Sequence, residues 1–407
     1  MINFAAKLWR GSLGLGSALI FNLELLLEFV RGKKIIIFQV HGASQLQHIE
    51  ALSYALQRSG HTTCFVLTPP KELELTSKRI KLRVRSYDTS LFLLFWHAVI
   101  AVDQGMRLPI CNPNKGHRIC LFHGQPSKGN SYTQFNDKYF DDLFFYGLMM
   151  KQRFLREKAL NPQWSEISTH DIGQPKSDIL IASELSQLRL HARSVLNIPE
   201  DKPTILYAPS FEASASLSLS GEEIIDALSQ PDQHLIVKPH PSFFRVLNPS
   251  DNTYTGVPHA SDWRESAREL EKIGGVTFPT SNQLPLDLAL PAADILVTDH
   301  SGIAFDAVLL DIPTVYFHCE DFFFSYLPKR FSIDGKAAVN DITCNAGRIA
   351  GDVVYSIEEL KDAITSNLAD KSRNGEARIQ VREKLLFNPG CATEIAADKV
   401  LELVKAN

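Results

Sequence analysis

The stretch "DILVTDHSG" (294–302) decides the fold that this sequence predicts. Its apolar and β-branched residues predict a buried strand, and "IAFDAVLLD" (303–311) after it predicts a helix. A strand that ends in polar residues and leads into a helix is typical of a parallel α/β sheet. Such sheets bind ligands beyond the carboxyl ends of their strands.

Short apolar runs alternate with helix-like segments along the whole chain, as in proteins built on parallel sheets. The first series of candidate strands comprises residues 34–40, 63–67, 98–103, 118–124, 142–147 and 170–173. The second series comprises residues 204–210, 234–240, 276–279, 294–300 and 314–317. Helical patterns cover residues 47–60, which close on the glycine at position 60, and residues 357–369 and 391–405.

The length also favours two domains, because 407 residues exceed the size at which a single core keeps growing. We expect an N-terminal helical segment at 1–33, a first Rossmann-like domain at 34–176 and a second at 177–390. The helix expected at 391–407 would cross back to the first domain.

Composition excludes some classes of function. The 42 basic and 46 acidic residues give a net charge of −4, which leaves no overall positive field for nucleic acid. The six cysteines are scattered, with no CxxC pair and no metal-ligand spacing. We therefore expect a reduced, cytoplasmic protein with no metal site and no nucleic-acid partner.

The N-terminus is the one segment whose pattern suits contact with a membrane. Lys7 and Arg10 precede the uncharged run at 11–23, and Glu24 and Glu28 then interrupt the apolar pattern. The run is shorter than the about 20 apolar residues that span a bilayer. Two interpretations stay open: a peripheral attachment at the inner face of the membrane, or a helix that packs on its own domain.

The polar end of the opening stretch suits a phosphate group. Ser301 and Gly302 would stand at a helix N-terminus, where free N–H groups and the helix dipole attract anions. Asp306 would lie in the first helical turns. The alternative is an ordinary capped helix, in which Asp299 and Ser301 only satisfy the first N–H groups.

Two histidines follow other candidate strands. In "LIVKPHP", prolines on both sides hold His240 at a strand end, with Lys238 two residues before it. In "LFHGQPSKG", His123 ends a strand and Lys128 follows. A histidine in such a place can donate to phosphate or act as a general base near neutral pH. The alternative in both places is a loop histidine with a structural role.

Two further motifs stand at strand ends. "YAPS" places Ser210 where it can bond to a phosphate or to the base of a nucleotide. "IGQPKSD" supplies Gly173, Pro175 and Lys176 at the expected domain junction, either as ligand contacts or as a hinge turn before an aspartate helix cap. The serine-rich stretch "SASLSLS" (214–220) predicts a mobile loop.

Several nucleotide and hydrolase motifs are absent from the sequence. There is no GxxxxGK[ST] loop, no GxGxxG after a strand and no GxSxG elbow. Their absence argues against P-loop hydrolysis and against hydride transfer from a nicotinamide.

Six motifs, taken in order, resemble the CDP-glycerol glycerophosphotransferases, the enzymes of teichoic-acid and related capsule assembly. They are "HGQPSK", "GQPKSD", "YAPS", "KPHP", "TDHSGIAFD" and "GCAT", and they span roughly residues 118–405. Each motif alone is weak, but all of them in this order are specific. The sequence departs from the family pattern at His300 and Gly302, where the family has Tyr and Ser. It also has Phe211 in place of Trp and Ser177 in place of Asn.

The resemblance implies an α/β protein of GT-B architecture, in which two Rossmann-like, doubly wound domains face each other across a cleft. Residues 34–176 would form the acceptor domain and residues 177–390 the nucleotide-donor domain. No cofactor would be tightly bound, and dependence on a divalent cation stays open. His123 and His240 would be the catalytic pair. The donor- and phosphate-binding residues that we expect are Lys128, Ser210, Lys238, Thr298, Asp299, His300, Ser301, Gly302 and Asp306.

The expected reaction moves a polyol-phosphate unit from a CDP-activated alditol to a hydroxyl of a glycan or polyol-phosphate polymer. His123 would deprotonate that hydroxyl, and His240 with the N–H groups at 301–302 would stabilise charge on the pyrophosphate and the leaving CMP. Two alternatives stay open. One is a GT-B nucleotide-sugar enzyme, such as a glycosyltransferase or a UDP-N-acetylglucosamine 2-epimerase. The other is a non-catalytic nucleotide-binding subunit.

Overall fold

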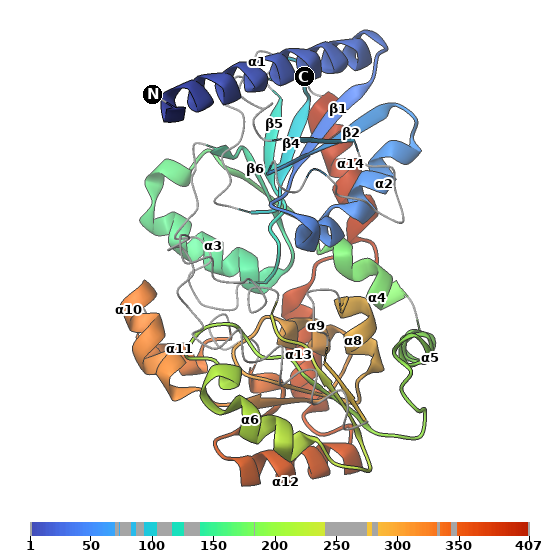
Figure 1. Cartoon of the computed structure of the whole chain (residues 1–407), viewed down its shortest axis with the longest axis vertical. Coiled ribbons are helices and arrows are strands. Elements are labelled where there is room, and N and C mark those ends of the chain that lie inside the picture. The colour runs from blue at the N-terminus through green and yellow to red at the C-terminus, as the bar shows by residue number, and fades with distance from the viewer. Residues whose placement is uncertain are drawn as a thin grey trace. The chain divides into compact units, whose positions relative to one another are not determined.

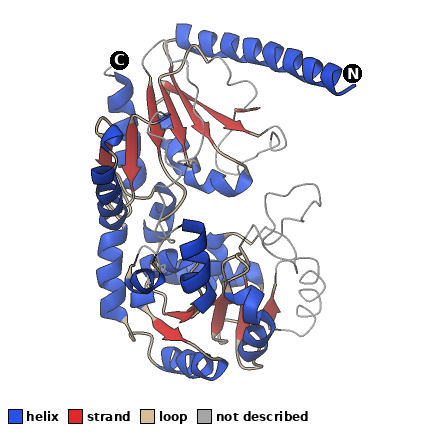
Figure 2. Ribbon diagram, turned by 90° about the vertical axis from the view of Figure 1, so that its left-hand side faces the viewer, coloured by secondary structure: helices blue, strands red, loops and turns tan. Residues whose placement is uncertain are grey.

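The chain divides into two compact units, each of which is described here by itself (Figure 1). The computed structural model describes residues 2–69, 73, 83–86, 93–103, 116–125, 139–182, 184–240, 275–278, 284–331, 334–342 and 348–405. Unit 1 comprises Met1–Gly124, Tyr132–Asp178 and Leu386–Asn407, and unit 2 comprises Gln125–Ser131 and Ile179–Leu385. In both units helices pack around a sheet (Figure 2). The domain boundaries expected from the sequence stay a prediction.

Unit 1 is built on a seven-stranded, parallel sheet with the strand order β3-β2-β1-β4-β5-β6-β7. Its strands are β1 (Lys34–Gln39), β2 (Thr62–Thr68), β3 (Val84–Ser86), β4 (Ala98–Ala101), β5 (His117–Cys120), β6 (Asp142–Phe145) and β7 (Ser168–Asp171). Its longer helices are α1 (Ile2–Val30), α2 (Glu50–Arg58), α3 (Leu148–Leu160) and α14 (Ala392–Lys405). Short helical turns are η1 (Ala43–His48), η5 (Pro162–Trp164) and η6 (Pro175–Ser177), and α4 (Asp178–Ala182) begins at the end of this unit.

Unit 2 is built on a six-stranded, parallel sheet with the strand order β10-β9-β8-β11-β12-β13. Its strands are β8 (Thr204–Tyr207), β9 (His234–Val237), β10 (Val276–Thr277), β11 (Ile295–Thr298), β12 (Thr314–Phe317) and β13 (Asp352–Val354). Its longer helices are α5 (Leu185–Leu196), α6 (Ser216–Leu228), α8 (Leu286–Ala292), α9 (Ile303–Leu309), α12 (Ile357–Ala369) and α13 (Gly375–Leu385). The remaining turns are η8 (Phe322–Tyr326), α10 (Leu327–Phe331), α11 (Gly335–Asn340) and η9 (Arg348–Ala350).

Helices cover both faces of the sheet in unit 2, as a doubly wound fold requires. Successive residues of a strand point to opposite faces, so Ile205 and Leu206 of β8 enter different core clusters. The cluster that contains Ile205 includes apolar residues of α6 and α12, and the other includes residues of α5, α8 and α9. The predicted parallel α/β class is therefore confirmed.

The predicted mobile loop at 214–220 is wrong, because helix α6 begins at Ser216. The backbone N–H and the hydroxyl of Ser216 both donate to the buried Asp299, at 3.0 and 2.9 Å. Leu217 packs in the core of unit 2. The serine-rich composition gave no sign of the bonds from Ser216 to Asp299 or of the packing of Leu217. The backbone at Ser220 does depart from helical geometry.

Helix α1 packs on unit 1 with some of its side chains and exposes others. Phe21 and Leu25 are buried, and the Phe21 ring packs edge-on against Phe65 of β2 at 5.3 Å. Glu28 is buried and accepts a hydrogen bond from the Thr63 hydroxyl at 2.8 Å. Packing on its own unit, one of the two interpretations of this segment, therefore holds for these residues. In the part of the chain that the structure describes, no helix is long and apolar enough to cross a membrane.

The C-terminal helix α14 belongs to unit 1 because both of its ends are bonded there. The Asp178 carboxylate accepts the backbone N–H groups of Ala392 and Thr393, at 3.2 and 2.6 Å. The Lys34 ammonium donates to the carbonyl of Val404 at 2.9 Å. An anion at the N-terminus and a cation at the C-terminus both complement the helix dipole.

A buried carboxylate joins three neighbouring strands of unit 1. Asp142, the first residue of β6, bonds to Nδ1 of His117 on β5 at 2.8 Å and to Nε2 of His170 on β7 at 2.7 Å. Burial alone would raise the pKa of Asp142, but the hydrogen bonds from both imidazoles outweigh it and lower this pKa. The hydrogen bond to Asp142 raises the pKa of His117.

These opposite shifts predict a pH window for the stability of unit 1. The His117 contribution is complete below the unfolded pKa of about 6.5 and is lost as pH rises through its raised folded value. The Asp142 contribution is present above the unfolded pKa of about 3.9 and is lost as pH falls through its lowered folded value. Asp142→Asn should therefore lower the free energy of unfolding by about 2 kcal/mol near pH 6, and by less at higher pH.

Asp141→Asn is the matched control. Asp141 pairs with Arg118 at 2.6 Å, but both side chains are partly exposed. Its loss should cost less than about 1 kcal/mol. Denaturant titrations of both variants between about pH 4 and pH 8 measure these differences. An equal loss of unfolding free energy in the two variants at every pH would contradict the proposed coupling of Asp142 to His117 and His170.

Candidate active site

The polar motifs of unit 2 follow strands that are neighbours in the sheet. "YAPS" lies at the end of β8, "KPHP" follows β9, and the polar residues of "DILVTDHSG" lie at the end of β11. In the sheet, β8 lies between β9 and β11. The carboxyl ends of parallel strands meet at one edge, so unit 2 brings Ser210, Lys238, His240 and the residues at 298–302 to that edge. His123 belongs to unit 1. Lys128 lies outside the described residues.

Asp299 organises this edge from the inside. Its carboxylate is only 2% exposed and accepts the backbone N–H groups of Ser210 at 3.0 Å, Ser216 at 3.0 Å and His300 at 2.7 Å. The hydroxyl of Ser216 is a fourth donor. The carboxylate therefore ties together the end of β8, the start of α6 and the end of β11. Its predicted contact with the donor stays a prediction.

Two other predicted residues also face inward. Thr298 is fully buried, and its hydroxyl donates to the carbonyl of Ala208 at 2.7 Å, which joins β11 to the end of β8. Asp306 is buried in α9. Thr298 thus stabilises the edge, and the predicted contacts of both residues with phosphate stay predictions.

Glu212 is a site residue that the sequence reading missed. It is buried and accepts hydrogen bonds from the Ser210 hydroxyl and from Nε2 of His300, the latter at 3.1 Å. The His300 ring stacks flat on Phe322, with 3.5 Å between the ring centroids and 6° between the planes. Glu212 thus holds Ser210 and His300, two of the residues predicted to bind the nucleotide donor, in place. No local spacing could indicate a partner 88 positions along the chain.

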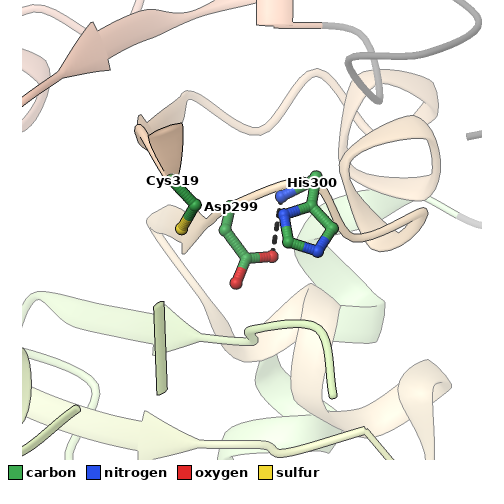
Figure 3. Close-up of side chains that lie close together, drawn as sticks. All are labelled: Asp299, His300 and Cys319. Atoms are coloured by element: carbon green, nitrogen blue, oxygen red, sulfur yellow. Dashed lines mark hydrogen bonds between the residues drawn. The ribbon is translucent and has the colours of Figure 1, made fainter. Parts of the chain in front are cut away.

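Asp299, His300 and Cys319 come close enough to be tested as a metal site (Figure 3). Each offers one ligand atom, and these atoms lie within 4.8 Å of one another. The Asp299 carboxylate, however, already accepts hydrogen bonds from four donors. Burial and the nearby Asp299 raise the pKa of the Cys319 thiol, whereas a metal needs the thiolate. The group fits a hydrogen-bonded core better than a metal centre.

Among the described residues, no side chain takes the first backbone donors of the turn after Asp299. Ser301 and Gly302 are half-buried, and no side chain caps the start of α9. The alternative of an ordinary capped helix therefore does not hold, because Asp299 bonds to other segments. The first N–H groups of a helix attract an anion when no side chain takes them.

Lys238 and His240 are both half-buried at the end of β9. The Lys238 backbone N–H donates to the carbonyl of Tyr207 at 2.8 Å, and burial lowers the pKa of its ammonium. The His240 ring lies against Phe211, with 4.6 Å between centroids. The serine motif and the histidine motif are thus in contact.

In unit 1, His123 stands after β5 with 60% of its side chain exposed. Its Nδ1 lies 3.9 Å from a carboxylate oxygen of Asp103, which follows the neighbouring strand β4. His48, at the end of η1, lies edge-on at 6.5 Å between ring centroids. Burial, Lys176 and His123 hold the pKa of His48 well below its ordinary value. The sequence reading missed both residues, although Asp103 at the end of an expected strand was a usable signal.

The "GQPKSD" motif packs on the start of α14. Gly173 has a positive φ of 98°, and a Cβ there would lie 2.2 Å from the carbonyl oxygen of Phe387. The carbonyl of Pro175 accepts a hydrogen bond from the Thr393 hydroxyl at 3.3 Å. Asp178 is a helix cap as one alternative expected, but it caps α14. Lys176 is half-buried, and ligand contact for it stays a prediction.

Comparison with known proteins finds several relatives of this chain. A teichoic acid glycerol-phosphate primase of Bacillus subtilis (strain 168) is 29% identical in an alignment 162 residues long, and the match covers 36% of this chain and 36% of that relative. The chain thus matches only about a third of the primase.

Solved structures show the same fold. The wall teichoic acid polymerase TagF is 14% identical and superposes with a TM-score of 0.63 over 98% of both chains. A complex of S. aureus MnaA with UDP is 14% identical, with a TM-score of 0.55 over 91% of this chain and 98% of that one. These likenesses confirm the GT-B fold class expected from the sequence.

The family profile described as CDP-Glycerol:Poly(glycerophosphate) glycerophosphotransferase matches residues 21–402. This match takes in almost the whole chain and confirms the resemblance carried by the six motifs. The chain belongs to the CDP-glycerol:poly(glycerophosphate) glycerophosphotransferase family.

Proposed function

We propose that this chain transfers a glycerol-phosphate-like unit from a CDP-linked alditol to a hydroxyl of a glycan or polyol-phosphate polymer. The observation that carries the proposal is the family match over residues 21–402, which includes the sheets of both units. The product would be a polymer of the teichoic-acid or capsule type. The enzyme would work in the cytoplasm, at the inner face of the membrane.

Unit 2 would hold the nucleotide donor. The half-buried turn at 301–302 offers backbone N–H groups, and Ser210 and His240 stand at the ends of the adjacent strands. Asp299 and Glu212 would act on the donor mainly through other residues, because both carboxylates are buried and already accept hydrogen bonds. They would instead hold the donor-binding segments in place. Preorganised donors of this kind stabilise the charge that develops in phosphoryl transfer.

Unit 1 would supply the general base. Asp103 faces Nδ1 of His123, which leaves Nε2 to take the proton from the acceptor hydroxyl. The acceptor oxygen would then form a bond to the distal phosphorus while the bond from that phosphorus to the bridging oxygen breaks. CMP leaves with that oxygen, and His240 and the N–H groups at 301–302 would stabilise its charge.

Helix α1 would contact the membrane surface. Its described part presents an apolar stripe at helical spacing, with Leu19, Ile20, Leu23, Leu27 and Val30 all exposed. Arg31 is exposed next to this stripe, and Lys7 and Arg10 precede it in the sequence. An apolar stripe flanked by basic residues suits an interface with anionic lipid.

A panel of donors tests the proposed reaction. The purified chain should release CMP from CDP-glycerol or CDP-ribitol when a glycerol-phosphate oligomer is present as acceptor. UDP-N-acetylglucosamine should give no product. Turnover of the UDP-sugar alone would identify a nucleotide-sugar enzyme, and binding of CDP-glycerol without turnover would identify a non-catalytic subunit.

His123 and Asp103 should affect kcat to different degrees. His123→Ala should lower kcat for CMP release by about 10²- to 10⁴-fold, because it removes the base. Asp103→Asn should lower kcat less and should change the pH profile, since Asp103 only orients the imidazole of His123. His61→Ala, an exposed histidine of unit 1, is the control and should keep full activity. Unchanged kcat in His123→Ala would reject the assignment of the base.

Glu212→Gln should weaken donor binding. The amide keeps the shape but cannot accept both hydrogen bonds as strongly, so Ser210 and His300 lose their fixed positions. We expect the KM for CDP-glycerol to rise about tenfold, which corresponds to about 1.4 kcal/mol, with a smaller change in kcat. Glu223→Gln on the exposed face of α6 is the matched control. An equal KM in both variants would show that Glu212 does not position the donor site.

A further inference from the structure

Unit 2 contains a buried arginine that has no acidic partner within the described residues. Arg348, in η9, is 5% exposed. Its guanidinium lies over the Phe323 ring, 4.9 Å from the centroid, and the side chain of Tyr355 is a neighbour. Its Nη1 has no hydrogen-bond partner in the part of the chain that the structure describes. Burial lowers the pKa of this guanidinium, as expected for a cation that is not neutralised.

The other buried arginines among the described residues of unit 2 are neutralised. Arg193 pairs with Asp294 at 2.6 Å, and Arg378 pairs with Asp311 at 2.7 Å. A buried charge without a counter-charge is costly, and folded proteins normally pair it. Arg348 therefore differs from these two in the way that an anion-binding residue would.

His318 repeats this feature beside Arg348. Its Nδ1 is buried and has no hydrogen-bond partner among the described residues. The imidazole stacks on Phe323 at 5.5 Å and contacts Tyr355 at 4.9 Å between ring centroids, so it shares both neighbours with Arg348. Burial and the Arg348 charge lower the pKa of His318 to about 4.

The pair lies at the edge of the sheet where unit 2 gathers its polar motifs. His318 follows β12, which pairs with β11, and Tyr355 follows β13, the next strand. Cys319, next to His318, has its sulfur within 4.8 Å of the ligand atoms of Asp299 and His300 (Figure 3). Through Cys319, His318 thus stands next to the segment that leads into the turn assigned to the donor.

We propose that Arg348 and His318 form an anion-binding subsite of unit 2 that takes a phosphate group of the nucleotide donor. The identity of the donor rests on the proposed function, whereas the anion chemistry rests on these two residues. A guanidinium binds phosphate through two parallel N–H bonds, and an imidazole beside it adds a third donor. Tyr355, which also contacts the His318 ring, is 63% exposed, so this neighbour of both residues reaches the surface.

The groups around His318 determine how its pKa changes when an anion binds. Among the described residues, the titratable groups near it are Arg348 on η9, Tyr355 after β13 and Cys319 after β12. Asp299 and Asp321 raise the pKa of the Cys319 thiol. A bound anion would offset the Arg348 charge. The pKa of His318 should then rise from about 4, and the protein should take up a proton when the anion binds.

Calorimetric titration of the full chain with inorganic pyrophosphate and with CDP tests the subsite. Arg348→Met should weaken binding of both ligands at least tenfold, Arg348→Lys should weaken it less, and His318→Gln should weaken it several-fold. Arg373→Gln is the matched control, since Arg373 is a half-exposed arginine of unit 2 paired with Asp352 at 2.8 Å. It should bind like the unchanged chain.

Thermal unfolding separates binding from folding. Because Arg348 is buried without an acid, Arg348→Met should unfold at the same temperature as the unchanged chain or at a higher one. A large drop in unfolding temperature, or loss of folding, would mean that the guanidinium is structural and would overturn the proposal. Equal affinity for pyrophosphate in Arg348→Met and the unchanged chain would also overturn it.

A failure of the anion subsite can be told apart from a failure of the proposed function. If Arg348→Met releases CMP from CDP-glycerol with unchanged KM, the subsite is wrong and the proposed function stands. If the unchanged chain binds pyrophosphate through Arg348 but turns over no CDP-linked donor, the subsite stands and the proposed function is wrong.

Discussion

The buried carboxylate of Asp299 is the interaction on which the polar edge of unit 2 depends. Its four donors come from Ser210, Ser216 and His300, which lie on three separate segments of the chain. A carboxylate buried at this depth needs such donors, because an unsatisfied charge would cost several kcal/mol. The requirement fixes the end of β8 and the start of α6 against β11. It thereby orients Ser210, His300 and the turn at 301–302, which we assign to the donor.

A second aspartate has a comparable role in unit 1. Asp178 accepts two N–H groups at the start of α14 and so joins the "GQPKSD" motif to the "GCAT" motif, although the two are more than two hundred positions apart. Several motif residues are therefore architectural, while His123 and His240 keep exposed or half-buried rings. A family motif thus combines residues that build the site with residues that face the substrate. Only burial and hydrogen bonding separate the two kinds.

Most of the fold was predictable because parallel strands are buried on both faces and appear as apolar runs. Strands such as β1 and β11 were expected within one or two residues, and helix α12 was expected at its observed bounds. Strands β3 and β13 were missed because each has three residues and contains a charged one, Arg85 or Asp352. Contacts such as Glu212 with His300, or Arg348 with Phe323, join distant segments, and no periodicity indicates them.

The central claim is that the acceptor attacks the distal phosphorus of a CDP-linked alditol. Phosphorus NMR of a reaction with CDP-glycerol and a glycerol-phosphate oligomer tests it most directly, because it follows both phosphorus atoms. The account predicts that the two diphosphate resonances are replaced by one CMP resonance and one phosphodiester resonance in equal amounts. Release of CDP with both phosphates intact, or an unchanged donor spectrum in the presence of acceptor, would contradict it.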